Sequence, residues 1–436
     1  MKLKWIGLTS LMLVLLIACS PEGPAEVLTS QQTPPEIKLL NPKYRLQEVE
    51  NCMVNEENLP GQAMRINGSA MRINGSEGGL LVGSIKDAAS TLDLGSDLSQ
   101  AFFQQAPGQN SALLIVDDFN GGTYNLGKEV FTLTSLNSAK FSNLKTKRQY
   151  SHGALVMHHV ESLLENSGFY HRPLAATVDN TNIRVWQASN QTYLVVIAVD
   201  TGLSDSRTIR NLTQAQLQQL QTGIETKWGR ISIDGPVAIN MSFAFMPCAI
   251  QDDFIWSNLT SFEAYMQELW VKNAHLNLSY DEFVKLVIDL TNQANDPLLT
   301  LLQDPIWGAS EHVYVASSGN YGLPYAMYPA QWPEVISVSG SSTDDPINRN
   351  QKFFNSGEIL EQGAWFSLAP KSQVYYAGTS FSAPTVSVFS ALDLASSQRC
   401  ASGNGISKLA HNGMTDSDYP LRPSPKNDSA VDKLCN

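Results

Sequence analysis

The chain has 436 residues, of which 43% are apolar and 16% are charged. This composition excludes a disordered acidic chain and a coiled coil, and the length is sufficient for one large enzyme domain with additional segments. The formal net charge is −12, and no block of the sequence is rich in Lys and Arg. Because phosphate binding requires a concentrated basic surface, we expect no nucleic-acid partner.

The first 18 residues predict a secretion signal. Lys2 and Lys4 precede the apolar stretch 5–18, which is too short to cross a bilayer as a normal helix. The stretch ends in Leu-Ile-Ala followed by Cys19, a sequence that resembles the bacterial lipobox. The resemblance implies cleavage before Cys19 and lipidation of its thiol. An ordinary secretion signal with an incidental cysteine is the alternative.

The next segment predicts a tether. Residues 20–36 carry four prolines and few large apolar side chains. We therefore expect residues 19–43 to be a Pro-rich, lipid-anchored tether. The membrane would be contacted through this anchor. The protein would lie in the cell envelope, facing the periplasm or the cell exterior.

An extracytoplasmic location permits disulfides. Four cysteines remain after Cys19, and they allow three pairings, among Cys52, Cys248, Cys400 and Cys435. A Cys400–Cys435 bridge is favoured because it would hold the tail, residues 401–436, which is rich in Gly, Pro and Ser. Cys52–Cys248 would then tie the N-terminal segment to the body.

Residues 44–108 form an N-terminal segment with little regular pattern. The heptapeptide AMRINGS occurs at 63–69 and again at 70–76. Two copies are too few for a solenoid, so a turn-rich loop is the favoured interpretation.

From residue 112 the pattern changes to short apolar runs separated by helical patterns. The runs occupy residues 112–116, 193–199, 236–241, 313–316 and 334–338. Runs without alternation are typical of strands buried on both faces of a parallel sheet. The sequence therefore predicts an α/β fold, with a parallel sheet flanked by helices.

Three helices are predicted from periodicity and capping signals. The first covers Gly153–Asn166 and ends before Gly168. Two more begin at the capping-box sequences 260–263 and 279–282, each followed by apolar residues at helical spacing. This helical pair is inserted between two strands.

Chemically useful residues follow the predicted strands, where the sites of open α/β sheets form. Asp117 follows the first run, and His152 opens the first helix. Asn320 follows the run at 313–316, and Ser380 opens an apolar helix near the end. An acid, a base, an amide and a hydroxyl thus all stand at turns.

The sequence Gly-Thr-Ser-Phe-Ser-Ala-Pro at 378–384 resembles the serine motif of the subtilisin-like serine proteases. Asp117 and the histidine at 152–153 match the family's other catalytic motifs, and the three motifs stand in the family's order Asp, His, Ser. Residues 316–320 match the oxyanion-hole segment, and residues 333–340 match a strand that follows it. The resemblance covers about residues 109–397.

The resemblance implies a catalytic domain over residues 109–400, with a subtilisin-like parallel sheet and the helical insertion between the oxyanion strand regions. Ser380 would be the nucleophile, His152 its base and Asp117 the acid that orients the base. Asn320 and the Ser380 N–H would form the oxyanion hole. The implied activity is that of a serine endopeptidase, which cleaves protein or peptide substrates through an acyl-enzyme.

The resemblance also implies that Ser242, Ala244 and Ser317 contact the substrate. Ala244 stands where the family has glycine, and its methyl group could narrow or redirect the first specificity pocket. Asp118 follows Asp117 where the family has Ser or Thr, and Asp118 itself is the alternative acid. Calcium sites occur in many relatives, but no carboxylate cluster in the sequence identifies one, so no metal ligand is assigned.

Many subtilases lose an N-terminal propeptide, and residues 44–108 are the candidate pro-region. Cutting the chain after Cys19 would release the enzyme from its anchor unless a disulfide held the pieces together. We therefore expect the segment to stay attached, helped by Cys52–Cys248. A catalytically weak or inactive lipoprotein that uses the fold as a binding module is the main alternative. A serine esterase would need a Gly-x-Ser-x-Gly elbow and a different residue order.

Overall fold

The computed structural model divides the chain into Met1–Glu36 and Ile37–Asn436, and every element below belongs to the second unit. The structure describes residues 36–46, 50–54, 108–119, 152–174, 182–188, 191–202, 204–259, 262–307, 312–320, 323–341, 355–362 and 378–395.

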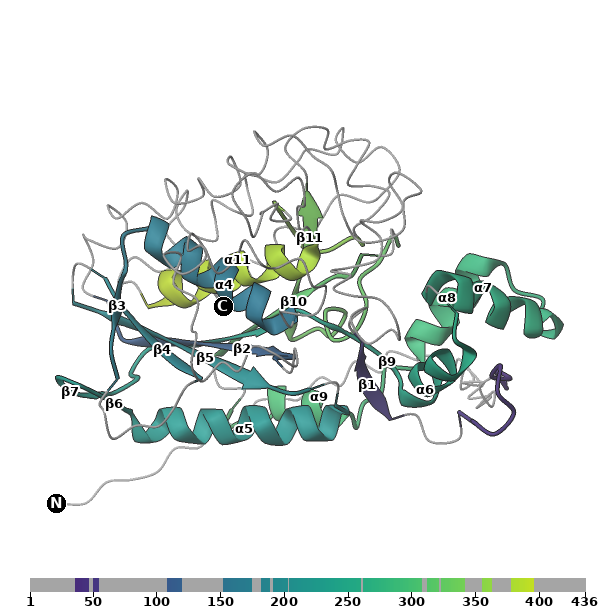
Figure 1. Ribbon diagram of the computed structural model, residues 1–436, viewed down its shortest axis with the longest axis horizontal. Coiled ribbons are helices and arrows are strands. Elements are labelled where there is room, and N and C mark those ends of the chain that lie inside the picture. Colours follow the sequence, from purple (N-terminus) through teal and green to yellow (C-terminus); the bar gives the residue numbers. More distant parts are fainter. Residues whose placement is uncertain are drawn as a thin grey trace, which may run out of the picture. The chain divides into compact units, whose positions relative to one another are not determined.

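A mostly parallel eight-stranded sheet organises the second unit (Figure 1). The strand order is β12 (Ile359–Gln362), β11 (Val335–Ser341), β10 (His312–Ser317), β8 (Val237–Met241), β2 (Ser111–Asp117), β5 (Tyr193–Asp200), β4 (Ile183–Gln187) and β3 (Tyr170–Arg172). All neighbours from β12 to β5 are parallel. The five apolar runs are strands β2, β5, β8, β10 and β11, so the α/β prediction is confirmed.

The edge formed by β4 and β3 is antiparallel, which the sequence analysis did not anticipate. Strand β4 is followed by a tight turn in which the Ala188 N–H donates to the Thr192 carbonyl at 2.9 Å. Such a short connection can join only antiparallel strands, because a parallel crossover needs a dozen or more residues.

Alternate residues of β2 pack on opposite faces of the sheet, as the two-residue period of a strand requires. Ala112, Leu114 and Val116 belong to the core that contains the apolar side of α5 (Ser206–Thr222). Leu113 and Ile115 belong to the core beneath α4 (His152–Asn166) and α11 (Thr379–Leu394). Figure 1 shows α5 on one side of the sheet and α4 with α11 on the other.

The helix predicted at 153–166 is α4, and Gly168 follows it with a φ of 81°. Helix α11 is buried along its whole length, from Thr379 to Leu394. Each helix has a residue that the sequence analysis singled out in its first turn, His152 in α4 and Ser380 in α11, and the two helices pack against each other. Helix α5, which the sequence analysis did not identify, is capped by Asp205, whose side chain accepts from the Thr208 N–H.

The predicted helical insertion lies between β9 (Ala244–Pro247) and β10. Figure 1 shows its first three helices beyond the β1 and β9 strands and its last helix beside α5. Its members are α6 (Cys248–Ser257), α7 (Phe262–Lys272), α8 (Tyr280–Asp289) and α9 (Pro297–Leu302). Helix α8 begins with the predicted capping box, in which Ser279 and Glu282 exchange hydrogen bonds. The other capping sequence includes Thr260, which lies outside the described residues.

Residues 37–46 and 50–54, called the N-terminal arm below, pack on the body. Strand β1 (Asn51–Val54) pairs antiparallel with β9. The expected disulfide between Cys52 and Cys248 is present. Met53 is fully buried in the main core. The N-terminal segment is therefore joined to the body by a covalent bond, a strand pairing and apolar packing.

The first part of the arm falls inside the segment predicted as the tether, yet it is bound to the helical insertion. The buried carboxylate of Asp253 accepts from the Leu40 and Asn41 N–H groups at 2.7 and 2.6 Å. The Asn273 amide accepts from the Lys38 N–H at 2.8 Å and donates to the Lys38 carbonyl at 3.0 Å. Side chains of α6 and the residue after α7 thus hold the backbone of the arm.

Several predictions concern residues outside the described ranges. They are the signal and lipid site at Cys19, the Cys400–Cys435 bridge, the duplication at 63–76 and the tail at 401–436. Within the described ranges, no helix combines the length and the apolar character that crossing a membrane would require.

Candidate active site

Strand β2 ends at Asp117 and helix α4 begins at His152, and the two side chains meet in the interior. The His152 Nδ1 lies 2.8 Å from Asp117 Oδ1 and 2.9 Å from Oδ2. Both residues are almost completely buried. Because an ionised carboxylate only accepts, this contact implies that Nδ1 carries a proton and leaves Nε2 as the basic nitrogen of a neutral ring.

Gly153 allows the close approach that brings these side chains together. Its N–H donates to the Asp118 carbonyl at 2.7 Å. A Cβ atom at this position would lie 2.8 Å from that carbonyl oxygen and 2.9 Å from the Phe119 ring. Any larger residue would therefore push the start of α4 away from the end of β2.

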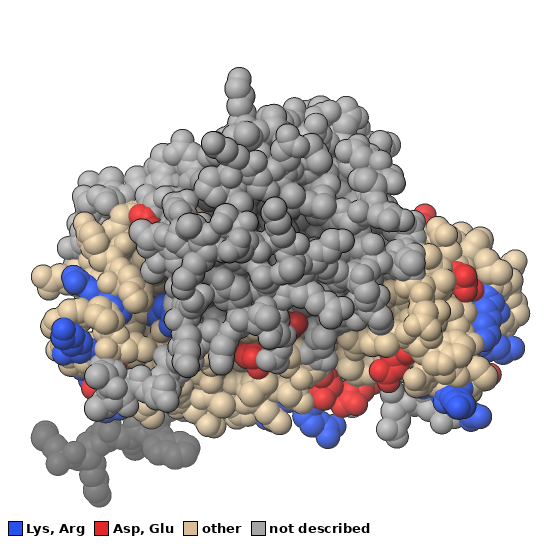
Figure 2. Space-filling model, in the orientation of Figure 1, with Lys and Arg blue, Asp and Glu red and all other residues tan. Residues whose placement is uncertain are grey.

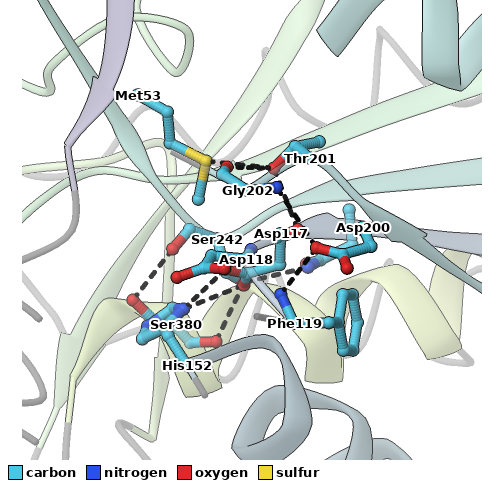
Figure 3. Close-up of polar contacts among 11 residues, drawn as sticks. Met53, Asp117, Asp118, Phe119, His152, Asp200, Thr201, Gly202, Ser242 and Ser380 are labelled. Atoms are coloured by element: carbon cyan, nitrogen blue, oxygen red, sulfur yellow. Dashed lines mark hydrogen bonds and ion pairs between the residues drawn. The ribbon is translucent and has the colours of Figure 1, made fainter. Parts of the chain in front are cut away.

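The pKa of the Asp117 carboxylate lies above its ordinary value, because burial outweighs the groups that stabilise the charge. Burial raises its pKa above the ordinary value, and the charge of Asp200 adds to this effect. The charge and hydrogen bond of His152 and the Asp118 N–H lower the pKa again. Asp200 itself accepts from the Phe119 N–H at 3.1 Å and the Gly202 N–H at 3.1 Å, so it organises the loop after β2 (Figure 3).

Ser380 lies in the first turn of α11 and is bound to the end of β8. Its hydroxyl donates to the Ser242 carbonyl at 3.2 Å, and the Ser242 hydroxyl donates to the Ser380 carbonyl at 2.9 Å. The ring of the next residue, Phe381, lies 6.4 Å from the His152 ring, between centroids. Figure 3 shows Asp117, His152, Ser242 and Ser380 in one cluster.

Asn320 follows β10, and its side chain is oriented by the residue before Ser380. The Asn320 Oδ1 accepts from the Thr379 N–H at 2.9 Å and from the Thr379 hydroxyl at 3.1 Å. Its oxygen therefore caps α11, and the amide nitrogen is the end left to donate elsewhere. Gly319 makes the turn with a φ of 107°, where a Cβ atom would lie 2.6 Å from Asn355 Nδ2.

A buried chain of hydrogen bonds supports Ser242 from behind. The Ser387 hydroxyl donates to Asn240 Oδ1 at 3.1 Å, and Asn240 Nδ2 donates to the Ser242 hydroxyl at 2.9 Å. Sequence reasoning missed Asn240 and Ser387 as parts of the site, and it gave no role to Thr379, although Thr379 lies in the serine motif at 378–384. The sequence signal for Asn240 and Ser387 is polarity inside otherwise apolar elements, since Asn240 interrupts a buried strand.

The remaining predicted residues take different places. Ala244 opens β9 and pairs with Val54 of the arm, so it belongs to the β1–β9 ladder. Ser317 ends β10 and is buried. Asp118, the alternative acid, donates its backbone N–H to Asp117, whose own carboxylate contacts His152. Within the described part of the chain, no group of three or more His, Cys, Asp or Glu side chains could hold a metal ion.

Comparisons with known proteins identify no family for this chain. No family model and no curated protein matches the chain. Among solved structures, the chain is similar to the prenylagaramide maturation protease PagA, with a TM-score of 0.34 and 14% identity. That match covers 79% of this chain and 98% of the other. A likeness at this level assigns neither fold family nor activity to this chain.

Proposed function

We propose that the chain is a serine endopeptidase that uses Asp117, His152 and Ser380 as its catalytic residues. The observation that carries the proposal is the contact of both Asp117 carboxylate oxygens with His152 Nδ1. His152 begins a helix that packs against α11, the helix whose first turn contains Ser380. An acid-held imidazole beside a hydroxyl is the arrangement that nucleophilic acyl transfer requires.

In the proposed reaction the Ser380 hydroxyl turns from the Ser242 carbonyl toward His152. The bond to Ser242 is long for an O–H···O contact, which favours this rotation. As Oγ bonds to the carbonyl carbon of the scissile peptide, its proton passes to His152 Nε2. Asp117 stabilises the imidazolium that forms, through the Nδ1 proton.

The same attack turns the substrate carbonyl into an oxyanion, for which two donors are proposed. One is the Asn320 amide nitrogen, since Thr379 occupies the amide oxygen. The other is the Ser380 N–H, which belongs to the first turn of α11. The positive end of the helix dipole adds to this stabilisation.

Collapse of the intermediate breaks the C–N bond, and His152 returns its proton to the leaving amine. Water then attacks the acyl-enzyme with His152 again acting as base, which releases the acid and restores Ser380. Each proton removed is thus returned, and no cofactor is consumed. A calcium ion stays a proposal by resemblance alone.

The proposed substrate is a protein or peptide, bound beside Ser242, Ala244 and Ser317. Nucleic acid is not proposed as a partner. Among the described residues on the face shown in Figure 2, Lys and Arg form small groups interspersed with Asp and Glu. The described residues on this face do not form the single extended basic surface that phosphate binding needs.

We also propose that the enzyme is anchored outside the cytoplasm through a lipid on Cys19. The Cys52–Cys248 disulfide supports this location, because such bonds persist in oxidising compartments. A Cys19→Ala variant is expected to leave the membrane fraction. Its retention in that fraction would count against the anchor.

A catalytically weak or inactive binding module is the second candidate. The observation that favours it is the hydrogen bond from the Ser380 hydroxyl to the Ser242 carbonyl, which directs the hydroxyl proton to the backbone and not to His152. Labelling with a fluorophosphonate probe separates the two candidates. Wild type and Ser390→Ala are expected to be labelled and Ser380→Ala is not, because the Ser390 hydroxyl donates within its own helix, to the Val386 carbonyl. A folded wild type that stays unlabelled would favour the binding module.

A further inference from the structure

His159 lies on α4 about two helical turns after His152, on the same side of the helix. Its side chain is buried, and its Nε2 lies 2.9 Å from the hydroxyl of Thr385 on α11. Its ring meets the Phe381 ring edge-on, with 6.1 Å between centroids. His159 therefore contacts the helix that carries Ser380, close to its first turn.

The Thr385 hydroxyl lies within hydrogen-bond distance of two groups, the Phe381 carbonyl at 3.2 Å and His159 Nε2 at 2.9 Å. The hydroxyl has one proton, and the tautomer of His159 decides whether Nε2 donates to it or accepts from it. In both cases His159, Thr385 and the Phe381 carbonyl form one series of polar contacts. That series ends on the backbone of the residue directly after Ser380.

The protonation state of His159 suits this role. Burial lowers its pKa to about 4, and contact with the Phe381 backbone opposes the shift. Near neutral pH the ring is therefore uncharged, with one donor and one acceptor nitrogen. The buried site accommodates such a ring without the cost of placing a charge in the interior.

Apolar contacts also join the two helices, but they do not fix their register. Val156 and Val160 of α4 share a core with Phe381 and Val388 of α11. Apolar contact is non-directional, so it tolerates small sliding and rotation of the helices. A hydrogen bond has a preferred distance and angle, which makes His159–Thr385 a directional link between them.

We propose that His159 is a positioning residue, which holds the helix bearing His152 in register with the helix bearing Ser380. The proposal rests on the proposed function, in which a proton passes between those two side chains. Misplacing reacting groups by about 1 Å can cost about 10²-fold in rate. A residue that touches neither the substrate nor the reacting atoms can thus control turnover.

The test compares variants that remove the link with variants that keep it. His159→Leu and Thr385→Val remove it, whereas His159→Gln keeps an amide donor and Thr385→Ser keeps the hydroxyl. We expect the first two to lower kcat by about 10- to 100-fold with KM changed less than about twofold. The second two should recover kcat to within about threefold of wild type. The double variant His159→Leu/Thr385→Val should be no worse than either single one.

A second readout does not depend on turnover. The Nδ1 proton of His152 in its bond with Asp117 is followed by NMR in wild type, Thr385→Val and Thr385→Ser. We expect its resonance to move in Thr385→Val and not in Thr385→Ser. An unmoved resonance, or wild-type kcat in a thermally destabilised Thr385→Val, would overturn the positioning role. If the wild type shows no peptidase activity but the His152 resonance moves in Thr385→Val and not in Thr385→Ser, the proposed function is overturned and the positioning role is not.

Discussion

Ser242 and Ser380 bind each other reciprocally, since each hydroxyl donates to the backbone carbonyl of the other residue. One residue follows β8 and the other lies in the first turn of α11, so this pair joins the sheet to the start of the helix. The Ser242 hydroxyl also accepts from Asn240. The position of Ser380 is therefore set by a strand end as well as by its own helix.

Removing the Ser242 hydroxyl should weaken this junction. Ser242→Ala loses the bond to Ser380 and leaves the buried Asn240 amide without its acceptor, which together should lower the free energy of unfolding by about 1–3 kcal/mol. Urea denaturation measures this change. Ser390→Ala is the matched control, and an equal loss in both variants would show that the junction is not special.

Replacing the acid should distinguish Asp117 from Asp118. Asp117→Asn should lower kcat by about 10⁴-fold, because the amide no longer holds His152 in the tautomer with Nδ1 protonated. Asp118→Asn should have little effect, since Asp118 contributes its backbone N–H to Asp117. Steady-state kinetics on a peptide substrate measures both. A larger loss in Asp118→Asn would make Asp118 the acid.

Asn320 can be tested without disturbing the cap on α11. Asn320→Asp keeps an oxygen for the Thr379 N–H and hydroxyl but lacks the amide donor. We expect kcat to fall by about 10²–10³-fold with KM nearly unchanged, the usual cost of losing one oxyanion donor. Unchanged kcat in a folded variant would remove Asn320 from the proposed site.

A buried acid on α4 should make stability depend on pH. Burial raises the pKa of Glu161 to about 8 from its ordinary 4.5, although Arg184, 3.6 Å away, lowers it. Between these two pH values the folded chain binds more protons at this site than the unfolded chain, so stability should fall as pH rises.

The melting temperature of wild type should therefore decline from about pH 5 to pH 8 more steeply than that of Glu161→Gln. Glu225→Gln is the control, because Glu225 pairs with Arg230 on the surface, where half of its side chain is exposed. Parallel pH profiles for wild type and Glu161→Gln would contradict this expectation.

The N-terminal arm should stay with the body after any cut that follows Val54. The Cys52–Cys248 bond spans 196 residues, and loop entropy alone gives about 5 kcal/mol as its upper contribution. Cys52→Ser/Cys248→Ser should lose less, because β1 still pairs with β9 and Asp253 still binds the arm. Thermal unfolding measures the loss.

Gel electrophoresis tests the same attachment directly. A processed wild-type chain should run as one species without reductant and separate with it. A mature chain that begins near residue 105 and has a free Cys248 would show that the N-terminal segment is discarded.

Local pattern was sufficient for the elements that hold the site. The apolar run 112–116 predicted β2, and the run at 313–316 predicted β10. A strand buried on both faces of a sheet needs apolar side chains at consecutive positions, so it can be recognised from local sequence. The candidate residues Asp117, His152 and Ser380 follow from such boundaries. The antiparallel strand β4 was not predicted, because its direction depends on the short connection to β5 and on its pairing with that strand.

By itself the sequence determined the α/β class and the order of the candidate residues. It left three cysteine pairings open, with Cys52–Cys248 as the pair that remains if Cys400 binds Cys435. Only the tertiary structure decided that both Asp117 oxygens meet His152, that Thr379 orients Asn320, and that His159 joins Thr385. The physical reason is range. Periodicity reflects the solvent exposure of neighbouring residues, whereas these hydrogen bonds join residues far apart in the chain, whose distances depend on how the whole core packs.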